Sequence, residues 1–130
     1  MIASITSAQV SGLTASLVDV EVDITRGLHS FSLVGLADKS VKEAQDRILA
    51  AVRNSGIILK AQGSTKIVVA LAPASLKKEG TFFDVAIALG FLAAQGQISF
   101  DPRGKLFLGE LSLTGELRPL RGVIMIATAA

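Results

Sequence analysis

The sequence contains no cysteine, no tryptophan and no tyrosine, and its one histidine is His29. Without cysteine the chain can form no disulfide framework, no thiolate metal site and no cysteine nucleophile. One histidine excludes a multi-histidine metal site, and we interpret His29 as an exposed or locally hydrogen-bonded residue of a turn. Because six phenylalanines are the only aromatic residues, nucleic-acid binding by base stacking is a weak hypothesis.

A large excess of one charge and long apolar runs are also lacking. Thirteen lysines and arginines stand against eleven acidic residues, and a net charge of +2 is too small to indicate DNA binding by itself. The longest uncharged apolar stretch, residues 85–94, is too short to span a bilayer. The first residues lack the pattern of a secretory signal. We therefore expect a cytoplasmic protein with no membrane partner.

Apolar residues, in contrast, make up half of the 130 positions, and 18% of the residues are charged. A chain of this length and composition can bury an ordinary core, which excludes disorder as its main state. We expect one domain spanning residues 1–130. The apolar, helix-compatible run from Gly122 to Ala130 stops without a cap, so we predict that the natural protein continues.

The N-terminal third reads as strands. Residues 2–10 are a first candidate, and residues 17–24 place four apolar side chains on one face and three acidic ones on the other. We interpret the acidic face as a solvated sheet surface, because a metal ion needs ligands that converge from several directions. Residues 31–34 alternate again, and the pattern predicts a hairpin between 17–24 and 31–34.

The middle of the chain predicts two helices around a strand. Ser40 and Glu43 have capping-box spacing, so a helix is expected to begin at Ser40 and to stop near Gly56. After a connection over 57–64, residues 66–72 are typical of a central strand covered on both faces.

A core helix without a solvated face follows over residues 82–95, and Asp84 suits the dipole of its first turn. Further on, residues 105–108 and 110–113 are short strand candidates. Residues 114–116 read as a turn, and 117–120 as an extended segment.

Two segments invite a binding-site interpretation. Lys39-Ser40 before a helix suggests a P-loop, but that motif needs glycine at positions occupied by Leu33 and Asp38, so we exclude it. The charged residues 77–80 lead into the core helix. They read either as a solvated loop or as a site that uses the positive end of the helix.

Five blocks in one order make the chain recognisable; they span residues 27–36, 41–47, 71–74, 78–84 and 109–118. Together they resemble the proteolytic domain of Lon proteases. More closely, they resemble the N-terminal Lon-like domain of the magnesium-chelatase-like (ComM/YifB) family of AAA+ ATPases. The resemblance implies an α+β fold of the ribosomal-protein second-domain-like superfold, with a mixed sheet and helices packed on it.

Lon proteases cleave peptides with a serine and a lysine, and the resemblance places these two positions at Phe82 and Ile124. Neither side chain can act as nucleophile or base, so the resemblance implies a domain that is not a protease. We expect the two apolar side chains to pack against each other and fill the former cleft. A residual peptidase that uses Thr81 is the least favoured alternative.

The family implies a non-catalytic module of a hexameric, ATP-driven DNA branch-migration motor. ATP and Mg²⁺ would bind in the AAA+ module expected after Ala130, and no cofactor is expected in residues 1–130. We expect this domain to serve assembly and to guide DNA, above all through Lys77, Lys78, Arg118 and Arg121. A purely structural oligomerisation domain is the alternative. The wider set of basic candidates is Lys39, Lys42, Arg53, Lys60, Lys66, Lys77, Lys78, Arg103, Lys105, Arg118 and Arg121.

Overall fold

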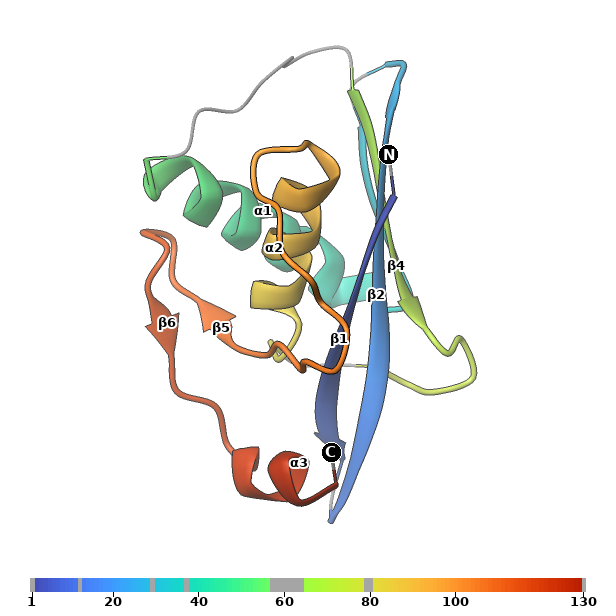
Figure 1. Cartoon of the computed structure of the whole chain (residues 1–130), viewed down its shortest axis with the longest axis vertical. Helices are drawn as coiled ribbons and strands as arrows, with labels where there is room; N and C mark the ends of the chain where they lie inside the picture. Colours follow the sequence, from blue (N-terminus) through green and yellow to red (C-terminus); the bar gives the residue numbers. More distant parts are fainter. Residues whose placement is uncertain are drawn as a thin grey trace.

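Alternating apolar residues in the first half of the chain form a four-stranded mixed sheet (Figure 1). The computed structural model describes residues 2–11, 13–28, 30–36, 38–56, 65–78 and 81–129. The strands are β1 (Ile2–Ser11), β2 (Thr14–Arg26), β3 (Ser30–Val34) and β4 (Thr65–Ala72), arranged in the order β1-β2-β4-β3. The β1–β2 and β2–β4 pairs are antiparallel, and the β3–β4 pair is parallel.

The predicted hairpin between residues 17–24 and 31–34 is wrong, because β4 lies between β2 and β3. β3 and β4 are joined through helix α1 (Asp38–Asn54), since parallel strands need a crossover that a tight turn cannot provide. β4 takes the interior position that its apolar sequence predicts. It is not covered on both faces, because the residues that alternate with Ile67, Val69 and Leu71 are half-buried or exposed.

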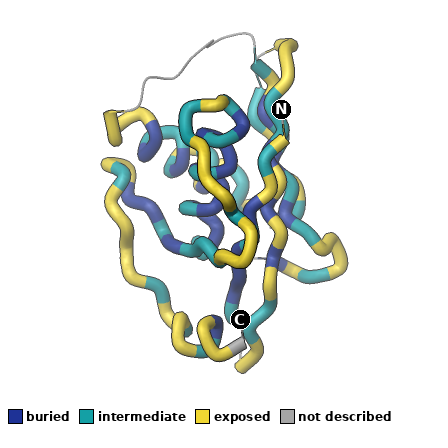
Figure 2. Tube along the Cα trace, viewed as in Figure 1, coloured by how far each residue is buried: buried dark blue, intermediate teal, exposed yellow. Residues whose placement is uncertain are grey.

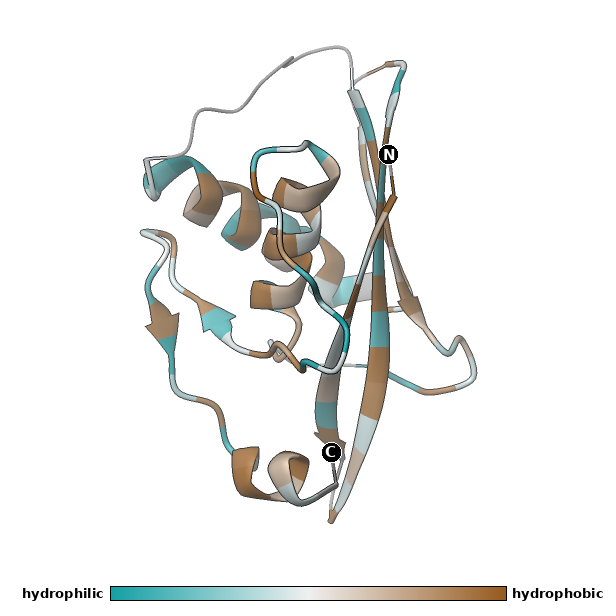
Figure 3. Cartoon of the chain, in the orientation of Figure 1, coloured by the Kyte–Doolittle hydropathy of each residue, from teal (hydrophilic) through white to brown (hydrophobic). Residues whose placement is uncertain are grey.

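The main core lies between one face of this sheet and helix α2 (Asp84–Ala94). Val18, Val20 and Val22 of β2 face this core and are fully buried. Their burial is worth about 1.5–3 kcal/mol per side chain. The other face of β2 carries Asp19, Glu21 and Asp23, which we call the acidic stripe. The banding of β2 in Figure 3 and the burial in Figure 2 follow this alternation.

Helix α2 is the core helix that the sequence predicts, since every one of its residues is buried or half-buried. It can lie close to the sheet because Gly90 has no side chain. A Cβ atom at Gly90 would come within 2.7 Å of the Val22 Cγ2 atom. Helix α1 packs beside α2 on the same side of the sheet. It begins at Asp38, so Ser40 lies inside the helix and is not its cap.

The C-terminal third forms a small hairpin and a short helix. Strands β5 (Glu110–Leu111) and β6 (Leu117–Arg118) pair antiparallel around the predicted turn. Residues 105–108 are not a strand, although the Phe107 amide donates to the Thr6 carbonyl at the edge of β1 with an N–O distance of 3.0 Å. The predicted C-terminal helix is confirmed as α3 (Val123–Ala129).

Helix α3 packs on the face of the β1–β2 ribbon opposite to α2. A Cβ atom at Gly122 would meet Val10 of β1, and Ile126 lines a small cavity with Ala8. Strand alternation places Val10 and Ala8 on the opposite face from Ile5, which lies under α2. The two packed layers are therefore separate, and Ile126 lies outside the main core cluster.

The described residues thus form an α+β fold with a mixed sheet and helices packed on it, as predicted. None of the helices in the described part of the chain has the length and apolar character needed to cross a membrane. His29, Lys60 and the connection over residues 57–64 lie outside the described residues.

Candidate functional site at the start of helix α2

The loop that leads from β4 to α2 holds a buried lysine. Lys78 is 1% exposed, and its Nζ atom donates to the carbonyl oxygen of Pro73 and, at 2.7 Å, to that of Leu76. The backbone of Lys78 also forms an isolated parallel bridge with Leu36, just after β3. The expectation of a solvated loop is therefore wrong for Lys78, although Lys77 beside it is exposed.

Gly35 makes room for this lysine. Its φ angle is +102°, a left-handed conformation that favours glycine, and a Cβ atom there would lie 2.5 Å from the Leu71 carbonyl oxygen and 3.1 Å from the Lys78 side chain. The lysine stem thus passes beneath a backbone that carries no side chain. A buried Lys78 side chain cannot reach a DNA phosphate, so we remove it from the candidate DNA contacts.

Two further polar side chains are buried on the core-facing side of β1, Ser7 and Gln9. The Gln9 Nε2 atom donates to the Lys77 carbonyl oxygen at 2.7 Å, which fastens the loop to the sheet. The Ser7 Oγ atom has no hydrogen-bond partner among the described residues. Of these two side chains, Gln9 therefore holds the loop in place.

The first residue of α2 forms the main polar contact of the site. Asp84 is 2% exposed and accepts two hydrogen bonds from Arg47 of α1, with an Nε–Oδ2 distance of 2.6 Å and an Nη2–Oδ1 distance of 2.8 Å. The backbone N–H of Leu111 in β5 donates to the same carboxylate at 3.0 Å. One carboxylate therefore joins α1, α2 and β5, which is more than the dipole role that its position in sequence predicts.

Burial raises the pKa of the Asp84 carboxyl above its ordinary value of 3.8, while the Arg47 guanidinium and the Leu111 amide oppose that rise. The hydrogen bond to Asp84 in turn raises the pKa of Arg47. A charged pair of this kind needs both members, because removing one leaves an uncompensated charge in the protein interior.

The two positions matched to the Lon catalytic pair are not brought together. Phe82 is half-buried, packs against the core cluster and lies with its ring centroid 6.5 Å from that of Phe83. Ile124 is 83% exposed and belongs to α3, on the opposite face of the β1–β2 ribbon. The expectation that these side chains pack together and fill a cleft is therefore wrong.

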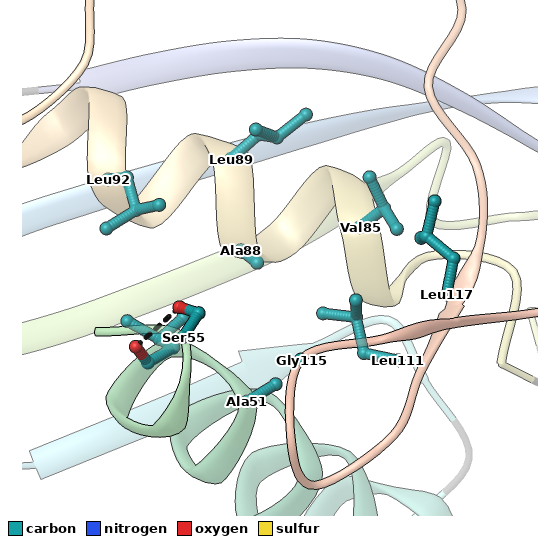
Figure 4. Close-up of a pocket in the computed structure, with 10 residues that line it drawn as sticks. Ala51, Ser55, Val85, Ala88, Leu89, Leu92, Leu111, Gly115 and Leu117 are labelled. Atoms are coloured by element: carbon teal, nitrogen blue, oxygen red, sulfur yellow. Dashed lines mark hydrogen bonds between the residues drawn. The ribbon is translucent and has the colours of Figure 1, made fainter. Parts of the chain in front are cut away.

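A small apolar groove lies between α1, α2 and the β5–β6 hairpin (Figure 4). Its volume is about 150 Å³. Ala88 and Leu92 of α2 face Ala51 of α1 and Ser55 just after it, with Leu111 also in the lining. The Ser55 hydroxyl donates to the Val52 carbonyl at 2.9 Å, so the one polar side chain of the lining is occupied.

The basic residues named from the sequence, leaving aside Lys60, which lies outside the described residues, belong to several different elements and loops. Lys42 pairs with Asp46 at 3.1 Å, and Arg103 pairs with Asp101 at 3.0 Å, so neighbouring carboxylates offset these two charges. The remaining exposed cations lie on α1, β4, β6 and three loops: Lys39, Arg53, Lys66, Lys77, Lys105, Arg118 and Arg121. Among them, Arg118 and Arg121 are close in sequence, at β6 and just before α3.

The family model for subunit ChlI of Mg-chelatase matches residues 20–130. The chain belongs to the ChlI family. It is 46% identical over 120 residues to the competence protein ComM of Haemophilus influenzae, and 44% identical over 120 residues to the uncharacterized protein YifB of Escherichia coli. Each match covers 92% of this chain and 23% of the relative. An uncharacterized protein of Mycobacterium tuberculosis is 42% identical over 125 residues, which cover 95% of this chain and 24% of that protein. The chain thus spans about a quarter of the length of these relatives.

These comparisons confirm the resemblance to the ComM/YifB proteins. In this ChlI-family chain, sequence reasoning missed the Arg47–Asp84 pair, although a signal for it was present. Asp84 is the only charged residue of an otherwise apolar helix, and a buried charge requires a partner. Which cation would pair with it could not be read from the sequence, because Arg47 lies 37 positions away.

Proposed function

We propose that this chain is a non-catalytic module of a longer ComM/YifB-type AAA+ ATPase, in which it supports assembly of a hexamer and guides DNA during branch migration. The family membership and the name of the ComM relative support this proposal. ATP and Mg²⁺ would act in the part of the protein outside these 130 residues. We further propose that the α+β fold is that of the Lon proteolytic domain.

The observation that supports the non-catalytic role is the chemistry at the start of α2, where the position that the resemblance matches to the Lon serine is Phe82; Ile124, matched to the lysine, lies apart from it on α3. A Ser-Lys mechanism needs an oxygen nucleophile and an amine within hydrogen-bond reach, and a benzyl and a butyl side chain offer neither. The lysine nearest to Phe82 in sequence is Lys78, and its ammonium group donates hydrogen bonds to two backbone carbonyls. Full-length protein is expected to release no product from unfolded casein. Turnover that disappears in Thr81→Ala would instead establish a peptidase.

For DNA guidance, the proposal favours the surface around β6 and the start of α3. Arg118 and Arg121 are exposed there, whereas the acidic stripe on the outer face of β2 would repel a phosphate backbone. Lys77 is the remaining exposed member of the four cations favoured from the sequence.

The test is the salt dependence of DNA affinity in the full-length protein. Each lost phosphate contact is expected to reduce the log–log salt slope by about 0.9. Arg118→Glu and Arg121→Glu should each show this reduction, and Arg26→Glu, an exposed arginine outside the proposed surface, should not. Equal slopes in all three variants and the parent protein would remove DNA guidance from the proposal.

Two basic side chains, Lys42 and Arg103, are paired with carboxylates, and Lys78 is buried. These observations favour a second candidate function, a purely structural oligomerisation domain. In that case the Arg118→Glu and Arg121→Glu variants would assemble and bind DNA like the parent. Light scattering on the same samples measures assembly independently. Hexamers with unchanged DNA affinity would therefore favour the structural role over DNA guidance.

A further inference from the structure

Two exposed apolar side chains lie on the β5–β6 hairpin and its turn, which border the apolar groove. Leu117 is 70% exposed and Leu113 is 58% exposed, and both belong to the β5–β6 hairpin or its turn. Leu117 also lines the groove, so the groove and the exposed leucine form one apolar surface. Contiguous apolar surface of this kind marks an interaction site.

The hairpin beside this groove is too small to be stable by itself. Each strand has two residues, and isolated two-stranded hairpins are marginally stable in water. It is held by the Leu111 amide on Asp84 and by the Asn54 side chain, whose Nδ2 atom donates to the Leu113 carbonyl at 2.8 Å. These contacts fix the inner side of the hairpin and leave Leu113 and Leu117 exposed.

The size and chemistry of the groove decide what can occupy it. Its volume of about 150 Å³ is below the range of about 300 Å³ and more that small-molecule sites occupy. Its one polar side chain, Ser55, already donates to a backbone carbonyl. The groove therefore fits one large apolar side chain of a polypeptide better than a polar ligand.

We infer that the surface formed by the groove, Leu113 and Leu117 docks an apolar segment from the remaining part of the same full-length polypeptide. This inference rests on the proposed function, in which the chain is one module of a longer protein. The relatives are about four times as long as the matched stretch, so such a segment has ample length. A tethered segment also has a high effective concentration, which lets a small apolar surface bind it.

Thiol labelling of the full-length protein tests this inference. The 130 residues contain no cysteine, so a cysteine introduced here reports one site, with labelling of the parent protein subtracted. The variants Leu117→Cys and Leu113→Cys each report whether the surface is covered. Leu13→Cys is the matched control, because Leu13 is 92% exposed and lies in the β1–β2 turn.

Docking predicts labelling by a maleimide about 10-fold slower or more at positions 117 and 113 than at position 13, with equal rates in denaturant. Similar rates at all three positions in a protein that hydrolyses ATP would overturn the inference and leave the proposed function intact. If dilution dissociates the oligomer and the cysteines at positions 117 and 113 then lose their protection from labelling, the occupant is a second copy of the protein. That result would also overturn the inference. A full-length protein that does not hydrolyse ATP would contradict the proposed function, whatever the labelling rates.

Discussion

Asp84 shows how one residue can hold a small domain together. Its carboxylate lies at the start of the core helix α2 and accepts hydrogen bonds from Arg47 and from the Leu111 amide. By contrast, the Lys42–Asp46 pair on α1 is exposed on both sides. Two ion pairs that involve α1 therefore differ in their contribution to stability. Solvent screens the Lys42–Asp46 pair and is largely excluded from the Arg47–Asp84 pair.

We expect Arg47→Met to lower the free energy of unfolding by about 2–4 kcal/mol, because it leaves Asp84 charged and buried without its partner. Lys42→Met removes the exposed pair and should change stability by no more than about 0.5 kcal/mol. Urea denaturation followed by circular dichroism measures both variants. Equal, small effects would show that the buried pair contributes no more than the exposed one.

The same variant should make stability depend on pH. Burial raises the pKa of Asp84 and Arg47 opposes the rise, so in Arg47→Met the folded-state pKa rises further above its unfolded value. Such a carboxyl stabilises the fold most at low pH, and that contribution is lost as pH rises through the folded-state pKa. The destabilisation by Arg47→Met should therefore grow as the pH rises above about 4, where the unfolded-state carboxyl ionises. In the double variant Arg47→Met/Asp84→Asn this added pH dependence should disappear. If the double variant still shows it, a group other than Asp84 causes the pH dependence.

At the scale of elements, periodicity identified the strands and the core helix, but the pairing of strands could not be deduced. The alternation in β2 and β3 is compatible with a hairpin. The actual partner of β2 is β4, which begins at Thr65, 39 positions after β2 ends at Arg26. Local alternation carries no information about a partner so distant in sequence. For the same reason the groove was not predictable, since α1, α2 and the hairpin contribute its lining from separate parts of the chain.

The contact between α2 and the sheet depends on Gly90. We expect Gly90→Ala to destabilise the fold by about 1–3 kcal/mol despite the better helix propensity of alanine, because its Cβ would overlap the Val22 side chain. In a background with Val22→Ala, which removes the overlapping methyl group, the same substitution should cost less. Thermal unfolding of the four proteins gives the coupling between the two sites, and additive effects would contradict the close contact.

For the molecule as a whole, the two faces of the β1–β2 ribbon have unequal cores. The face under α2 carries the large cluster, whereas α3 covers only the turn end of the other face, with Ile126 against Ala8. With seven residues, α3 is too short to be stable without packing. The C-terminal helix therefore depends on a small cluster that is separate from the main core.

Amide hydrogen exchange should resolve this difference. We expect the amides of α3 to exchange about 100-fold faster than those of β2 and β4, because α3 can open without disrupting the main core. Mass spectrometry of peptides from the two regions measures both rates in one experiment. Equal protection would mean that the two clusters unfold as one cooperative unit.

The acidic stripe has a consequence for how the long ribbon assembles. β1 is made largely of small and polar residues, so its own pattern says little about which residue of β2 it should face. A shift of β2 by one position would turn Asp19, Glu21 and Asp23 under α2 and move the three valines into water. Burying unpaired carboxylates costs several kcal/mol for each ion. The charges on the outer face therefore select a single strand alignment by penalising its nearest competitor.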